Sequence, residues 1–106
     1  MIILKALGFM ETRGRIGAIV ATDTALKAAN VNLIALKRVS GGLVLVIIEG
    51  EVAAVQEAIE AAKKQLLRIS CGLLTNIIPR PDKVTVELIE NVRKRTLTVR
   101  KDPGRD

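Results

Sequence analysis

The sequence predicts an α+β domain on the split βαβ (ferredoxin-like) plan: a four-stranded antiparallel sheet with two main helices on one face, followed by a short C-terminal helix. Two observations lead to this fold class. Stretches typical of strand, helix and strand occur in that order and then repeat, in two parts of similar length, residues 1–39 and 43–78. The 106 residues, 49% of them hydrophobic, are enough for one buried core and leave no room for a second domain.

The first half is expected to hold a strand, a helix and a second strand. Residues 2–9 are mostly apolar and run into a charged turn that contains Gly14, as a buried strand does. Residues 15–30 are rich in alanine and end at Asn30, a residue type that tolerates the left-handed conformation after a helix. Large apolar side chains at helical spacing lie near one side of this segment: Ile16, Ile19, Val20 and Leu26. Residues 31–39 are expected to form the second strand.

The second half repeats this order. Residues 43–49 predict a third strand, which Ser40-Gly41-Gly42 would join to the second strand as a hairpin. The clearest helix follows, with apolar residues at steps of three and four: Val52, Val55, Ile59, Ala62 and Leu66. Residues 73–78 predict a fourth strand, which the prolines within residues 79–81 end.

A short third helix is expected after the last strand. Asp82 is placed to cap it, and Val84, Leu88 and Val92 would share one side of the helix. A strand is the alternative at this point, because Val84, Val86 and Leu88 also alternate. The helix is therefore the least defined element of the predicted fold.

Charge divides the chain near residue 92. The net charge is +6, of which the eleven basic and nine acidic residues within 1–92 contribute +2 and residues 93–106 contribute the remaining +4. We therefore expect one domain over residues 1–92 and a basic tail over 93–106, in which residues 96–99 could add a strand or be disordered. A basic tail can touch RNA, DNA or an acidic partner, but it is more often a solvated terminus.

The composition argues against catalysis. The chain has no His, Trp or Tyr, and Phe9 is its only aromatic residue. Without imidazole it lacks the side chain that most readily transfers protons near neutral pH, and it cannot form a His-based triad or an ordinary zinc site. Cys71 is the only thiol and has no acid, base or second thiol near it in sequence, so we expect it to be packed and inert. No enzymatic activity, cofactor or metal is expected.

Two further classes receive little support. The longest apolar run, residues 43–48, is too short to span a membrane, and residues 1–9 lack the basic leading segment of a secretory signal, so a cytoplasmic protein is expected. Gly14-Arg15-Ile16-Gly17 is a GxxG motif with a basic residue, which KH domains use to clamp a nucleic-acid backbone between two helices. Here the motif joins a strand to a helix, so a tight turn is the favoured interpretation.

Four stretches together resemble the signature segments of bacterial microcompartment shell proteins of the hexameric, single-BMC-domain type. They occur in the order and with the spacing of that family, over roughly residues 3–90. The stretches are residues 6–14 (ALGFMETRG), 27–31 (KAANV), 40–44 (SGGLV) and 78–81 (IPRP).

The resemblance implies a structural shell protein: a homo-hexameric tile that joins other shell proteins edge to edge around encapsulated enzymes in the bacterial cytoplasm. It implies that Lys27 lies at the tile edge with Asn30 close by, and that Arg80 reaches across the same edge. Lysine and arginine can donate hydrogen bonds to carbonyl groups of a neighbouring tile, which fits these roles. No membrane or nucleic-acid partner is implied.

The resemblance further implies that the Ser40-Gly41-Gly42 hairpin rings a central pore for small polar metabolites. We count Arg38, which directly precedes the turn, among the pore-lining residues, because with Lys37 it would place a positive field at the mouth. The family usually has a serine flanked by glycines at this point, so the narrowest position here could fall to Gly41. The basic tail has no counterpart in the shared core.

Two other functions are weighed against the shell protein. The first is a small nucleic-acid-binding domain that uses residues 14–17 and the basic tail. The second is a ferredoxin-like enzyme or ligand sensor, which lacks both histidine and a carboxylate pair in an apolar setting. Salt-dependent RNA binding would favour the first alternative, whereas tiles should assemble without nucleic acid.

Overall fold

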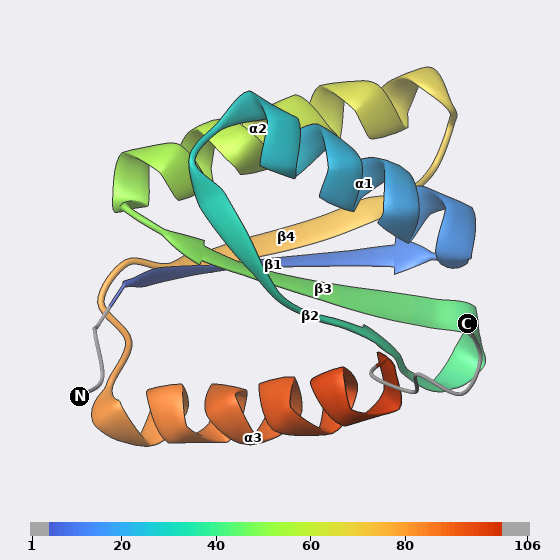
Figure 1. Ribbon diagram of the computed structural model, residues 1–106. Helices are drawn as coiled ribbons and strands as arrows, with labels where there is room; N and C mark the ends of the chain where they lie inside the picture. The colour runs from blue at the N-terminus through green and yellow to red at the C-terminus, as the bar shows by residue number, and fades with distance from the viewer. Residues whose placement is uncertain (1–4, 101–106) are drawn as a thin grey trace.

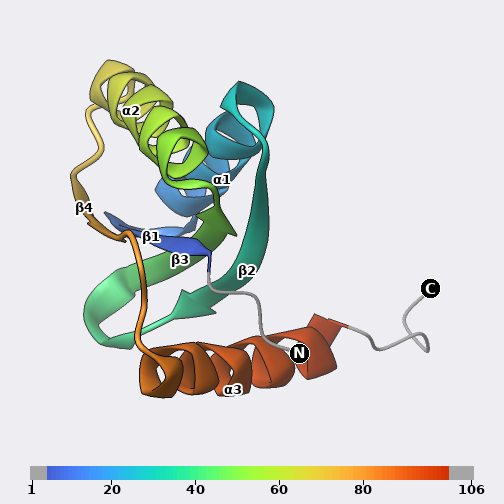
Figure 2. The same ribbon diagram turned by 90° about the vertical axis from the view of Figure 1, so that its left-hand side faces the viewer.

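A computed structural model of the chain describes residues 5–100, and the side chains of residues 5–94. Its elements, in chain order, are β1 (Ala6–Arg13), α1 (Arg15–Ala28), β2 (Val31–Arg38), the 3-10 turn η1 (Ser40–Gly42), β3 (Leu43–Gly50), α2 (Val52–Arg68), β4 (Leu73–Ile78) and α3 (Lys83–Arg100). The strands form one antiparallel sheet in the order β2-β3-β1-β4. Helices α1 and α2 cover one face of the sheet and α3 crosses the other (Figures 1 and 2). The predicted fold class is confirmed.

β1 begins and ends later than the sequence predicted. It pairs along its whole length with β3, from Ala6 opposite Gly50 to Arg13 opposite Leu43. The charged residues near its end therefore belong to the strand and not to a turn. The register of β3 decides the bounds of β1, because every residue of β1 finds a partner there.

The main core lies between the sheet and the pair α1 and α2. The predicted apolar stripe of α2 is confirmed, with Val55, Ile59, Ala62 and Leu66 at most 2% exposed. Burial of a side chain such as Leu66 stabilises the fold by about 2 kcal/mol. A second, smaller cluster lies on the other face of the sheet, beneath α3: Leu7, Ile34, Ala35 and Ile47.

Helix α1 buries its small residues instead of its large ones. The side that carries Ile16 and Ile19 faces away from the core, with exposed fractions of 75% and 59%. The buried positions are Gly17, Ala18, Ala21 and Ala25. Because α1 packs against both the sheet and α2, only small side chains fit between them. The apolar spacing predicted the helix correctly but not its buried face.

Helix α3 differs from the short helix that was expected. Asp82 caps it as predicted, since its carboxylate accepts a hydrogen bond from the Val84 amide at 3.0 Å. The helix has 18 residues, so residues 96–99 continue it instead of forming a strand, and the expected boundary at residue 92 falls inside it. Val84 and Leu88, expected on the packed side, are 62% and 60% exposed.

The side of α3 that faces the sheet is set by packing on the second cluster. Val86 is buried, and Ile89 and Val92 pack against that cluster. Their spacing of three residues keeps them on one stripe of the helix. The expected stripe runs in steps of four from Val84. Of the three residues that face the sheet, it includes only Val92.

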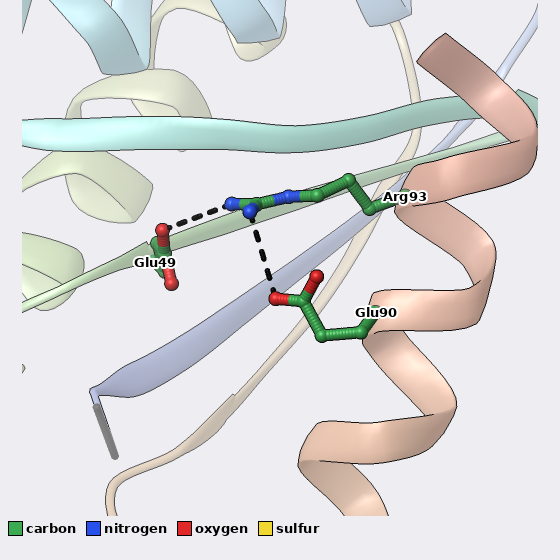
Figure 3. A network of polar contacts seen from close by, with 3 residues as sticks. All are labelled: Glu49, Glu90 and Arg93. Atoms are coloured by element: carbon green, nitrogen blue, oxygen red, sulfur yellow. Dashed lines mark hydrogen bonds and ion pairs between the residues drawn. The ribbon is translucent and has the colours of Figure 1, made fainter. Parts of the chain in front are cut away.

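A polar network joins α3 to the sheet (Figure 3). Arg93 donates through Nη2 to Oε2 of Glu49 on β3 at 3.2 Å, and its Nη1 lies 3.5 Å from Oε2 of Glu90 on α3. All three side chains are partly exposed, so we expect each pair to contribute below about 1 kcal/mol. Arg93, the first residue of the expected tail, is therefore part of the folded domain. Residues 101–106 of that tail lie outside the described residues.

Candidate pore and edge sites

The connection between β2 and β3 forms one end of the molecule, which we call the hairpin end (Figure 1). Arg38 and Val44 are paired at this end of β2 and β3, and η1 joins the two strands. Gly14, in the turn between β1 and α1, donates its amide hydrogen to the carbonyl oxygen of Gly42 at 2.7 Å. Two separate turns are thus held together at this end.

The hairpin itself consists of three exposed residues. Gly41 and Gly42 have φ values of 74° and 79°, in the left-handed region that glycine enters without a steric penalty. A Cβ atom at either glycine would meet nothing within 4 Å. Backbone geometry therefore requires both glycines, and the same residues leave Ser40 and two bare stretches of backbone facing outward.

The two basic residues before the hairpin lie on different faces of the sheet. Arg38 pairs with Val44, which belongs to the core under α1 and α2. Lys37 pairs with Leu45, which packs in the cluster beneath α3. Because residues opposite each other on paired strands share a face, positive charge is present on both sides of this end.

The predicted edge residues lie at the opposite end of the sheet, which we call the edge end. Lys27 is in the last turn of α1, Asn30 is in the connection from α1 to β2, and Arg80 is in the connection from β4 to α3. Figure 2 views the molecule from this end. Asn30 and Arg80 adjoin the two outer strands, β2 and β4, so one chain does not bring them together.

Each edge residue presents its polar group to solvent. Lys27 forms an ion pair with Asp23 one turn earlier at 2.9 Å, and the side chains are 76% and 60% exposed. A lysine ammonium has three donors, so two remain for a partner. Arg80 stands exposed between two prolines, whose rings restrict the backbone of this connection. Among the described side chains, residues 5–94, the guanidinium group of Arg80 has no hydrogen bond or ion pair.

The GxxG motif is a strand-to-helix turn, as favoured. Gly14, with a φ of 91°, directly precedes α1. Gly17 is buried, and a Cβ atom there would lie 2.5 Å from Sγ of Cys71 and 3.3 Å from Cβ of Thr12. Close packing against β1 and the connection from α2 to β4 therefore explains the second glycine, which argues against a nucleic-acid clamp.

The thiol of Cys71 lies in the connection from α2 to β4. Cys71 is partly buried beside Gly17, and its Sγ lies 4.0 Å from the carbonyl oxygen of Arg13. Among residues 5–100, no three His, Cys, Asp or Glu side chains are grouped to hold a metal ion. Within that range, no helix is both long and apolar enough to cross a membrane.

Comparison with known proteins identifies the family. Residues 6–81 match the model of the BMC domain. The chain belongs to the BMC-domain family. The BMC domain covers the whole sheet with α1 and α2, and it ends before α3 begins. Both the hairpin and the edge residues lie inside it.

Named relatives of this BMC-domain chain are shell proteins. It is 40% identical over 78 residues to the bacterial microcompartment shell protein EutM of Salmonella typhimurium, covering 74% of this chain and 81% of that one. It is 44% identical over 79 residues to the carboxysome shell protein CsoS1A of Hydrogenovibrio crunogenus, covering 74% and 82%. The crystal structure of a microcompartments protein from Desulfitobacterium hafniense superposes on this chain with a TM-score of 0.71 and 31% sequence identity. The match covers 79% of this chain and 48% of that one, so this chain spans about half of that protein.

Sequence reasoning missed two features of the structure. The first is the outward apolar face of α1, for which the run of small residues Gly17, Ala18, Ala21 and Ala25 at helical spacing is a usable signal. The second is the contact of Arg93 with β3, for which the sequence carries no signal, because 44 residues separate the partners.

Proposed function

We propose that the chain is a structural component of a bacterial microcompartment shell, a tile made of six copies in a ring, with no reaction of its own. The observation that carries this proposal is the opposition of the hairpin end and the edge end. In a ring whose axis passes the hairpin end, the edge end of every copy lies at the perimeter. A single orientation of the chain in the ring would therefore place the hairpin at the pore and the edge residues at the perimeter.

The pore would be lined by six copies of residues 40–42, with Arg38 behind them. Serine hydroxyl and backbone N–H groups on the axis suit small polar or anionic metabolites. The absence of side chains at Gly41 and Gly42 would set the bore. Since Lys37 and Arg38 place charge on both faces, anions should be favoured at either mouth, more at low salt than at high salt.

The edge would be formed by Lys27, Asn30 and Arg80. Because Asn30 and Arg80 adjoin opposite sides of the sheet, a contact between them needs a second copy, which a neighbouring tile would supply. Lys27 and Arg80 would donate to carbonyl groups of the neighbouring tile, whether that tile is this protein or another shell protein. The assembled shell would lie in the bacterial cytoplasm around its enzymes.

Exposed apolar side chains support assembly. Ile16 and Ile19 on α1 are 75% and 59% exposed, and Leu67 at the end of α2 and Leu74 on β4 are 78% and 68% exposed. Ile16 and Ile19 are three residues apart and so adjoin each other on α1, and adjoining exposed apolar groups are typical of surfaces that a partner covers. Two different parts of the chain carry them, as a head-to-tail ring requires.

The test is the mass of the purified protein in solution, measured by light scattering at micromolar concentration, with electron microscopy of negatively stained material. We expect a hexamer without added metal or nucleotide, and flat sheets at higher concentration. A stable monomer would contradict the proposal. Saturable RNA binding that falls steeply with salt would favour the nucleic-acid-binding alternative instead.

A further inference from the structure

A hollow of about 240 Å³ lies between the turn from β1 to α1 and the hairpin. It belongs to a single chain, so its existence does not depend on a ring. The residues that line it are Gly14, Arg15, Arg38, Val39, Gly42, Leu43 and Val44.

Two arginines from different elements line this hollow. Arg15 is the first residue of α1 and Arg38 is the last residue of β2. Arg38 shares a face of the sheet with Val44, the face on which α1 lies, and this brings the two arginines to the same side. None of the residues lining the hollow is acidic. Among the described side chains, residues 5–94, the guanidinium groups of Arg15 and Arg38 form no hydrogen bond or ion pair.

This arrangement selects a class of ligand. A guanidinium group presents paired N–H donors that match the oxygens of a phosphate or carboxylate group, and it stays protonated at any physiological pH. Two such groups close together repel each other unless an anion lies between them. We propose that the hollow binds a small oxyanion, one phosphate or carboxylate group per chain, held between Arg15 and Arg38.

Occupancy of the hollow would also act on the hairpin. Gly14 and Gly42 both line the hollow and are joined by a hydrogen bond of 2.7 Å. An anion held between Arg15 and Arg38 bridges the same two turns a second time. Binding should therefore slow hydrogen exchange of the amide of Gly14.

The experiment is a calorimetric titration of the purified protein with inorganic phosphate, at ionic strength held constant with chloride. We expect saturable binding of one phosphate per chain, weakened about tenfold by Arg15→Gln and by Arg38→Gln, since each removes a charge-assisted pair of hydrogen bonds. The matched control is Lys37→Gln, which removes the same charge from the adjacent residue on the other face of the sheet. It should change the affinity less than twofold. A parallel titration with malonate decides whether phosphate or carboxylate is preferred.

Two results would overturn the inference. One is the absence of saturable binding with both phosphate and malonate. The other is a loss of phosphate affinity in Lys37→Gln as large as that in Arg38→Gln. Such a result would mean that a basic surface attracts anions in general and that the hollow holds an adventitious ion only. Light scattering of the same samples separates this site from the proposed ring: saturable binding by a monomer would keep the site and reject the hexamer, and a hexamer without binding would do the reverse.

Discussion

The turn at the hairpin end consists of two glycines and a serine, whereas the edge end carries a lysine, an asparagine and an arginine. The turn leaves backbone bare, and the long side chains of Lys37 and Arg38 lie on the strand before it. The edge end extends long donors from a helix terminus and a proline-bounded connection. The two ends of one small sheet are therefore suited to different tasks, an opening at one end and contacts between molecules at the other.

The largest effect should come from the edge. Lys27→Ala and Arg80→Ala should leave the ring intact but reduce sheet formation at least tenfold, because a loss of about 1 kcal/mol per hydrogen bond recurs six times around each ring. Sheets would be counted by electron microscopy against total protein. Lys64→Ala, on the exposed side of α2, is the control of equal charge. If both edge variants assemble like the parent, the edge assignment is wrong, and if one does, that residue is misassigned.

The next largest effect should come from the hairpin end, where a substitution is expected to change passage through the pore but not assembly at the edge. Gly41→Leu should close the pore while rings and sheets still form, since six leucine side chains would converge on the axis. Ser40→Leu is the companion variant, because Ser40 does not adopt a positive φ and its replacement adds no backbone strain. Entry of a small anion into assembled shells would be measured. Unchanged entry in both variants, or a structure of the ring with this loop on the outer perimeter, would reject the pore.

A third variant tests the packing behind the hairpin end. Gly17→Ala should lower the free energy of unfolding by about 2 kcal/mol in urea titrations, because its methyl group would overlap Sγ of Cys71. Gly72→Ala is the control, since a Cβ atom there meets nothing within 4 Å. Adding Cys71→Ala to Gly17→Ala should recover at least about 0.5 kcal/mol. Equal stability of all variants would show that Gly17 of α1 and Cys71 are not packed as described.

A smaller effect tests whether backbone conformation alone requires the hairpin glycine. Gly41→Ala should lower the free energy of unfolding by about 1 kcal/mol, because a φ of 74° brings the methyl group close to the following carbonyl. Gly41→Asn should cost less, since asparagine tolerates this region. Thermal unfolding followed by circular dichroism measures both. Equal losses would mean that contact with a neighbouring copy, and not φ, determines the residue.

The smallest effect concerns the edge end within one chain. Asp23→Asn removes the ion pair of Lys27, and because both groups are exposed the free energy of unfolding should fall by no more than about 0.5 kcal/mol. Sheet formation should persist, since Lys27 remains. Loss of sheets would show that Asp23 orients Lys27 toward the neighbouring tile. Chemical denaturation and electron microscopy of the same preparation provide both measurements.

Much of the architecture could be predicted from the order of local patterns. The alternation of strands and helices, the apolar stripe of α2, the glycine hairpin and the Asp82 cap all depend on residues within a few positions of one another. Local spacing suffices for these features, because a stripe at steps of three and four, a left-handed glycine and a capping carboxylate act through the nearest backbone. The candidate residues at both ends were found by family resemblance, which the sequence carries in four short stretches.

Tertiary packing decided the features that depend on distant partners. Which side of α1 is buried depends on the narrow space left between α2 and the sheet, so Ala18 and Ala21 face inward and Ile16 faces outward. How α3 is oriented depends on the cluster around Leu7 and on Glu49, which receives Arg93 from 44 residues away. The opposition of the two ends and the placement of Arg15 and Arg38 around one hollow arise in the same way. Such contacts form only when strands far apart in the chain come into register, and no pattern confined to one segment records that register.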